Sequence, residues 1–198
     1  WCRAAAPRQV HRLVVIEGMS GPPSLVREWL DAPYHVRMRD WIAQVQDLAT
    51  RVPKRYASIE AACERMREEN PSLTPEQARH LTVHGVLRNE DGTFSWLFDN
   101  YMRPLMPQTY RYDEHALDAT YANISCPALF LCGLQSWHGD PATDGRLAPF
   151  RCPYRNVVFP DAGHWLHHDQ LEAFLHELAA FLRDADAGRI PRPVASKL

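Results

Sequence analysis

Residues 128–133 read Ala-Leu-Phe-Leu-Cys-Gly, an unbroken apolar run that ends at a glycine. A run of this kind is typical of a strand that is buried on both faces, as in a parallel sheet. Residues 13–16 (Leu-Val-Val-Ile) and 156–159 (Asn-Val-Val-Phe) share the pattern, and loop-forming residues follow each of them. The sequence therefore predicts one buried strand near the start of the chain and two in its last third.

Helical patterns fill most of the space between these runs. Apolar residues recur at helical spacing over residues 26–50, Ser58 is a candidate N-cap, and Thr74 is a second one with Pro75 in the first turn. Residues 89–96 are typical of a turn between two short strands, and residues 170–183 form an amphipathic helical pattern. Strands separated by helices predict an α/β fold with a parallel sheet, in the order strand, long helical region, strand, helix, strand, helix.

Length, charge and cysteine content argue against several classes of function. The chain has 198 residues, enough for one domain or one domain with an insertion. Its 22 basic and 24 acidic residues give a net charge of -2, which provides no general attraction to nucleic acid or to an anionic membrane. No apolar run approaches the roughly 18 residues of a membrane-spanning helix. The 5 cysteines contain no C-x-x-C pair, so we expect free thiols, and nothing in the sequence indicates a metal or a cofactor.

The clearest local motif is Gly163-His164-Trp165-Leu166-His167-His168-Asp169. His164 comes just after the third predicted strand, and open α/β sheets place reactive groups in such loops. Because the pKa of an ordinary imidazole lies near working pH, His164 is a candidate general base. The alternative is a loop histidine that only bonds a backbone carbonyl. A metal site is disfavoured, since His-x-x-His-His is not a standard zinc spacing.

Two carboxylates could orient this imidazole. Glu17 directly follows the first predicted strand, so it also lies at a carboxyl end, as the third member of a catalytic triad would. Asp140 comes seven residues after Gly133, at the end of the second predicted strand. Residues 4–18, 126–133 and 163–169 together resemble the sixth, seventh and eighth strands and loops of an α/β-hydrolase. Residues 58–62, 70–73, 84–85 and 91–96 are similar to the cap of its serine hydrolase-like branch.

The resemblance implies three regions: a hydrolase core over residues 1–25, a mostly helical cap over 26–122, and the last two core strands with the carboxyl-terminal helix over 123–198. It implies that His164 is the catalytic histidine. The family's acid often lies three residues after the glycine of the seventh strand, where this chain has Ser136. Other branches place the acid after the sixth strand, so we expect Glu17 to be the acid, with Asp140 as the alternative. In the cap we expect aromatic residues to roof an apolar pocket, namely Trp29, Trp41, Phe94, Trp96 and Tyr101.

The chain departs from the family at the nucleophile. No G-x-S-x-G elbow occurs in it, and neither Ser20 on its loop nor Cys132 inside a strand is a suitable replacement. The resemblance therefore implies a later-strand part of an esterase that acts through a Ser-His-acid triad, and we expect the isolated chain to be inactive. An aspartate nucleophile would instead imply a dehalogenase or an epoxide hydrolase. The competing interpretation is an inert chain that acts in binding or assembly.

The expected partners follow from these interpretations. They are a small ester-like substrate and either a complementary amino-terminal chain or a second copy, since an unpaired strand edge invites pairing. We expect a cytoplasmic protein. The terminal Ser196-Lys197-Leu198 matches a peroxisomal address, which is the alternative.

Overall fold

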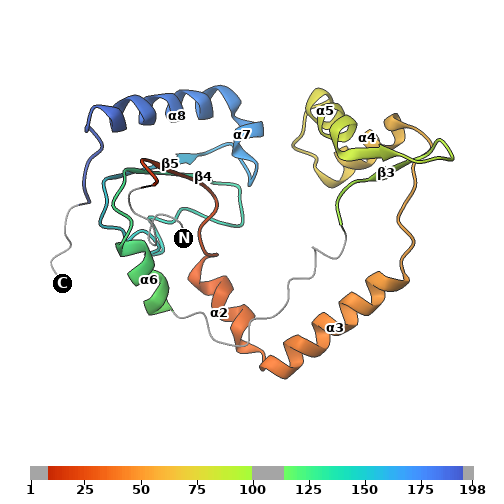
Figure 1. Cartoon of the computed structure of the whole chain (residues 1–198), viewed down its shortest axis with the longest axis horizontal. Coiled ribbons are helices and arrows are strands. Elements are labelled where there is room, and N and C mark those ends of the chain that lie inside the picture. The colour runs from red at the N-terminus through yellow and green to blue at the C-terminus, as the bar shows by residue number, and fades with distance from the viewer. Residues whose placement is uncertain (1–8, 100–113, 194–198) are drawn as a thin grey trace. The chain divides into compact units, whose positions relative to one another are not determined.

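The computed structural model describes residues 9–99 and 114–193, which belong to two compact units (Figure 1). The first unit holds the described residues up to 29 and from 114 onward, and the second holds residues 30–99. From the sequence we expect the cap to cover residues 26–122. The helix α6 (Glu114–Ala122) falls within that range, but in the structure it belongs to the unit that contains the sheet. Ser196-Lys197-Leu198 and Tyr101 lie outside the described residues.

The first unit is built on a parallel sheet in the order β1 (Leu13–Ile16), β4 (Ala128–Gly133), β5 (Tyr154–Phe159). Leu13 pairs with Ala128, and Ala128 pairs with Tyr154. Every residue of β4 is buried, because this strand has a neighbour on each side. The three predicted strands are therefore confirmed.

Alternate side chains of β4 enter two separate cores. Leu129 and Leu131 pack with Phe174 and Phe181 of α8 (Leu171–Asp186), which lie two helical turns apart on one face of that helix. Ala128 and Phe130 point to the opposite face, into a cluster with Ile124, Cys126, Leu147, Phe150 and Cys152. A strand covered on both faces needs apolar residues at successive positions, which explains the uninterrupted run.

The prediction that residues 13–16 are buried on both faces is wrong. Ile16 is 38% exposed, because β1 pairs only with β4 within the described part of the chain and so forms an edge of the sheet. A second correction concerns the connection from β4 to β5, where a helix was expected. Residues 134–153 form turns instead. Gly139 and Gly145 have φ values of 62° and 88°, which a helix does not allow.

The helical stretch expected over residues 26–50 consists of two helices. Helix α2 (Pro23–Asp31), which starts in the first unit, and α3 (Tyr34–Thr50) are separated at Pro33, since proline cannot continue a helical ladder. Ser58 and Thr74 do cap α4 (Ile59–Glu69) and α5 (Pro75–Gly85), and Gln77 completes a capping box with Thr74.

The turn at residues 89–96 joins the antiparallel strands β2 (Val86–Arg88) and β3 (Phe94–Trp96), as predicted. Trp96 contacts the Tyr56 ring edge-on, with ring centroids 6.2 Å apart. The aromatic residues of the hairpin thus take part in the packing of their own unit. None of the helices in residues 9–99 and 114–193 has the length and apolar character of a membrane span.

Candidate active site

Three loops meet at the carboxyl edge of the sheet. Glu17 follows β1, Ser136 lies in the loop after β4, and His164 lies between β5 and the short helix α7 (Leu166–Asp169). Parallel strands present their carboxyl ends at one edge, so residues far apart in the sequence come together there.

Glu17 is held in a special conformation and is fully buried. Its φ is 44°, in the left-handed region that non-glycine residues rarely adopt, and its side chain is 0% exposed. Its Oε1 accepts a hydrogen bond from the Gly133 N–H at 2.7 Å. Its Oε2 accepts one from the Ser136 hydroxyl at 2.6 Å, and His164 Nδ1 lies 2.6 Å from the same oxygen. Three surrounding donors suit an ionised carboxylate, which is an acceptor at every position.

His164 is fixed at one ring nitrogen and open at the other. The Glu17 carboxylate makes Nδ1 the protonated nitrogen, because a carboxylate can only accept. Within the described residues, Nε2 has no hydrogen-bond partner, and the side chain is 43% exposed. The lone pair of Nε2 is therefore available to take a proton from a reacting group.

Asp140 lies elsewhere in the site. Its Oδ1 accepts hydrogen bonds from the Ala142 N–H at 2.9 Å and from Asn156 Nδ2 at 2.8 Å, which fasten the turn after β4 to β5. No contact between Asp140 and His164 is present in the described part of the structure. Of the two carboxylates considered from the sequence, the fold brings Glu17 to the imidazole.

Two tryptophans flank His164 and were not singled out from the sequence. The Trp137 ring centroid lies 5.5 Å from that of His164, and the Trp165 centroid lies 6.3 Å from it. Trp137 and Trp165 are 59% and 53% exposed, so they place exposed apolar surface beside the imidazole. Trp165 directly follows His164 and Trp137 directly follows Ser136, and this adjacency to loop residues at the ends of strands is the signal that could have identified them.

Gly133 has no room for a side chain. A Cβ there would lie far inside van der Waals contact with the carbonyl oxygens of Ala162 and Gly163, both of which are backbone atoms. The loops after β4 and β5 cross at this point, and the Gln135 N–H donates to the Ala162 carbonyl at 3.0 Å. Glycine is required so that the loop carrying His164 can approach the strand that bonds Glu17.

We expect Gly133→Ala to lower the free energy of unfolding by about 3 kcal/mol, because the clash is with backbone that cannot rotate away. Urea denaturation of the two proteins measures this difference. Gly18→Ala is the matched control, since its Cβ would meet no atom nearer than 3.7 Å and should change stability by less than about 0.5 kcal/mol. Equal effects of the two substitutions would contradict the packing argument.

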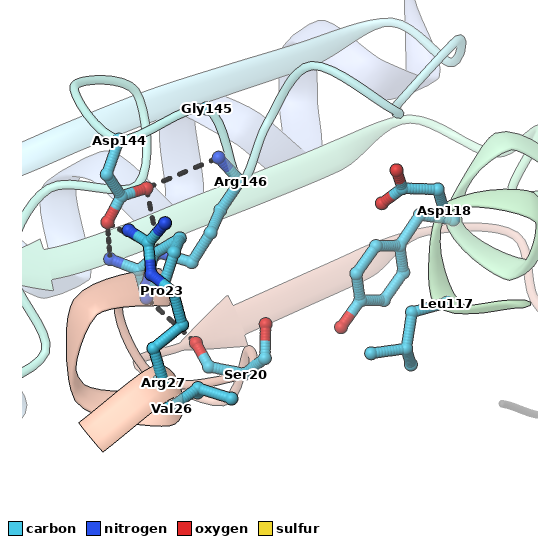
Figure 2. A pocket seen from close by; sticks show the side chains of 11 residues that line it. Ser20, Pro23, Val26, Arg27, Leu117, Asp118, Asp144, Gly145 and Arg146 are labelled. Carbon is cyan, nitrogen blue, oxygen red and sulfur yellow. Dashed lines mark hydrogen bonds and ion pairs between the residues drawn. The ribbon is translucent and has the colours of Figure 1, made fainter. Parts of the chain in front are cut away.

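The nucleophile candidates weighed from the sequence are both poorly placed. Cys132 is 1% exposed, and burial raises the pKa of its thiol to about 11. Ser20 lines a cavity of about 250 Å³ between α2, α6 and the turn at residues 144–146 (Figure 2). No histidine is among the residues that line this cavity, so the pair formed by Ser20 and an imidazole that a Ser-His-acid triad needs is not found there.

We expect iodoacetamide at pH 8 to alkylate the half-exposed Cys63 and to leave Cys132 and Cys152 unmodified. Burial raises the pKa of both buried thiols to about 11, so roughly one molecule in a thousand carries the thiolate at that pH. Peptide mass spectrometry after a timed reaction gives the modified fraction at each cysteine. Rapid alkylation of Cys132 in the folded protein would reinstate it as a nucleophile.

The histidines after His164 serve the packing of α7. Burial and the neighbouring His168 lower the pKa of His167, whose ring lies 6.0 Å from that of Phe174. In the described residues, no group of three or more His, Cys, Asp or Glu is arranged to hold a metal ion.

Comparison with known proteins identifies solved structures of similar fold. No model of a protein family and no curated protein matches the chain. Solved structures do: an E-2-(acetamidomethylene)succinate hydrolase is 21% identical with a TM-score of 0.62, covering 91% of this chain and 60% of its own. A thioesterase domain from the curacin biosynthetic pathway is 18% identical with a TM-score of 0.64, and the match covers 90% of this chain and 61% of that domain. An esterase of M. tuberculosis is 18% identical with a TM-score of 0.61, and the match covers 91% of this chain and 57% of the esterase.

The chain therefore has the α/β-hydrolase fold, with its parallel strands and helices matching part of each of these structures. It spans about three fifths of the length of these three proteins, between 57% and 61%. At these identities the likeness establishes the fold, and the chemistry has to be argued from the site.

Proposed function

We propose that this chain carries the acid–base half of an esterase-type hydrolase, in which His164 is the general base and Glu17 the acid that orients it. The observation that supports this most directly is the 2.6 Å contact between His164 Nδ1 and a Glu17 carboxylate that is wholly buried. A buried carboxylate is unfavourable unless it is paired, and its left-handed backbone is a further cost. Such an arrangement is found more often at functional sites than in structural loops.

The proposed reaction is acyl transfer from a small ester. His164 Nε2 takes the proton of a nucleophilic hydroxyl as the hydroxyl oxygen bonds to the acyl carbon, and it then gives that proton to the departing alkoxide. In the second half, water is activated in the same way and releases the acid. Glu17 keeps Nδ1 protonated and stabilises the imidazolium that forms in each step. The nucleophile in this proposal lies outside the 198 residues, because no G-x-S-x-G is present in them.

The test compares the complete gene product with the 198-residue chain on p-nitrophenyl acetate. We expect the complete product to hydrolyse the ester and the 198-residue chain to be inactive. A fluorophosphonate should add to one serine of the complete product, seen as a mass increase. Hydrolysis without any such adduct would point to an aspartate nucleophile and to dehalogenase or epoxide hydrolase chemistry.

A binding chain without catalysis is the second candidate, and the unpaired edge of β1 favours it. Within the described residues β1 has a neighbour on one side only, and such an edge can pair with a strand of another chain. Under this proposal the complete gene product would hydrolyse no ester and would take up no phosphonate. Sedimentation would then report a stable complex with a second chain or a second copy.

A further inference from the structure

We propose that Ser136 is a positioning residue of the His164–Glu17 pair, whose hydroxyl holds the carboxylate in the rotamer that faces the imidazole; this rests on the function proposed above. The Ser136 hydroxyl and His164 Nδ1 contact the same oxygen, Glu17 Oε2, each at 2.6 Å. The Gly133 N–H holds the other oxygen at 2.7 Å. Gly133 holds Oε1 and Ser136 holds Oε2, so both oxygens of the carboxylate are bound by groups other than the imidazole that they orient.

The direction of the Ser136 hydroxyl is set by its own neighbours. The His138 N–H donates to Ser136 Oγ at 3.2 Å and occupies one of its lone pairs. The Ser136 N–H donates to the Gly133 carbonyl at 3.1 Å, which fixes the turn that presents the side chain. The hydroxyl therefore accepts from one side and donates its single proton to Glu17.

Arg146 holds this turn in place through buried hydrogen bonds. Its side chain is 4% exposed, it donates to the His138 carbonyl at 2.6 Å, and its Nη1 lies 3.1 Å from His138 Nε2. Burial and the Arg146 guanidinium lower the pKa of His138, which favours the neutral imidazole beside this cation. Arg146 also donates to the Ser20 carbonyl at 2.9 Å, and Asp144 balances its charge at 2.8 Å (Figure 2). One guanidinium thus joins the loop that carries Glu17 to the loop that carries Ser136.

Position 136 requires a side chain that can donate a hydrogen bond to Glu17. An aspartate at residue 136 would place a second carboxylate against Glu17, and two acceptors at hydrogen-bond distance repel unless one of them is protonated. A serine instead adds a hydrogen bond to a charged acceptor, which is stronger than a bond between neutral groups. Ser136 thereby favours Glu17 as the acid.

The experiment uses the complete gene product with Ser136→Ala, Ser136→Thr and Ser136→Cys. We expect Ser136→Ala to lower kcat on p-nitrophenyl acetate about tenfold, the effect of one charge-assisted hydrogen bond, while KM changes less than twofold. Proton NMR with isotope-labelled histidine should show the His164 Nδ1–H resonance weakened by faster solvent exchange. Ser136→Thr should restore both readouts, and Ser136→Cys, a weaker donor, should lie between. Ser95→Ala is the matched control, because Ser95 also loses one hydrogen bond, from Asn89 at 2.8 Å, but in the other unit.

Unchanged kcat and an unchanged Nδ1–H resonance in Ser136→Ala would overturn the positioning role. So would an equal loss in Ser136→Thr and Ser136→Ala, because the threonine retains the hydroxyl. Full activity of His164→Ala would refute the proposed function instead, and the NMR comparison would still decide whether Ser136 orders the pair. A thermal melt of each variant separates unfolding from loss of positioning.

Discussion

Replacing His164 by alanine is expected to lower the kcat of ester hydrolysis by the complete gene product by a factor on the order of 10⁵. His164 Nδ1 is bound to Glu17, and Nε2 has no partner among the described residues, so this ring is the group that can move the proton. Without it, the nucleophile must lose its proton to water, and the leaving alkoxide must depart without a general acid. Steady-state hydrolysis of p-nitrophenyl acetate measures the loss, and added imidazole should restore part of the rate to the alanine variant.

His176→Ala is the matched control for this prediction. His176 lies on an exposed part of α8, so the same substitution there should leave kcat within experimental error. A similar loss in both variants would show that damage to folding explains the effect. A His164→Ala protein that keeps its kcat while still melting cooperatively would exclude His164 as the base.

The sheet could be predicted from the sequence because its strands carry their own signal. The runs at 13–16, 128–133 and 157–159 are apolar, and the longest of them, 128–133, is the strand that is covered on both faces. The pairing of Glu17 with His164 was also accessible, since Glu17 directly follows one strand, His164 lies in the loop after another, and parallel strands end at one edge. Thr74 and Ser58 could be identified as caps from the few residues around them.

Other features could not be read from the sequence, because they depend on which neighbours a segment has. The apolar run at 13–16 does not say how many strands flank it, and Ile16 is exposed because β1 is an edge. Residues 134–153 are a different case, because Gly139, Pro141 and Gly145 are local turn signals that disfavour the helix expected there. The contacts of Arg146 with the Ser20 and His138 carbonyls join segments far apart in the sequence, and no local pattern encodes them.

The choice between Glu17 and Asp140 illustrates the same limit. Both follow predicted strands, and sequence position alone cannot say how a side chain is aimed. The left-handed backbone of Glu17 turns its carboxylate under the Gly133 N–H, whereas Asp140 bonds Asn156 and caps its own turn. Ser136 was excluded as an acid on chemical grounds, and its value as a donor became visible only with the 2.6 Å contact to Glu17.

Glu17→Gln is expected to lower kcat by a factor on the order of 10⁴ with little change in KM, because the substitution reverses the imidazole tautomer. A carboxylate accepts from all three donors around it, while an amide offers one oxygen and an NH₂ group. The backbone N–H of Gly133 cannot move, so the amide oxygen stays with it and the NH₂ group takes the place of Oε2. His164 must then accept at Nδ1 and carry its proton on Nε2, where it cannot act as a base.

NMR of isotope-labelled histidine identifies the protonated nitrogen of His164 directly, in parallel with the kcat measurement. Glu172→Gln in the first turn of α8 is the control, since it removes the same charge from an exposed position and should alter neither reading. A Glu17→Gln protein with the wild-type tautomer and wild-type kcat would return Glu17 to the role of a buried structural carboxylate. Loss of kcat with the Nδ1–H tautomer retained would leave charge as the contribution of Glu17, because the orientation of His164 would then be unaltered while the imidazolium lost its counter-ion.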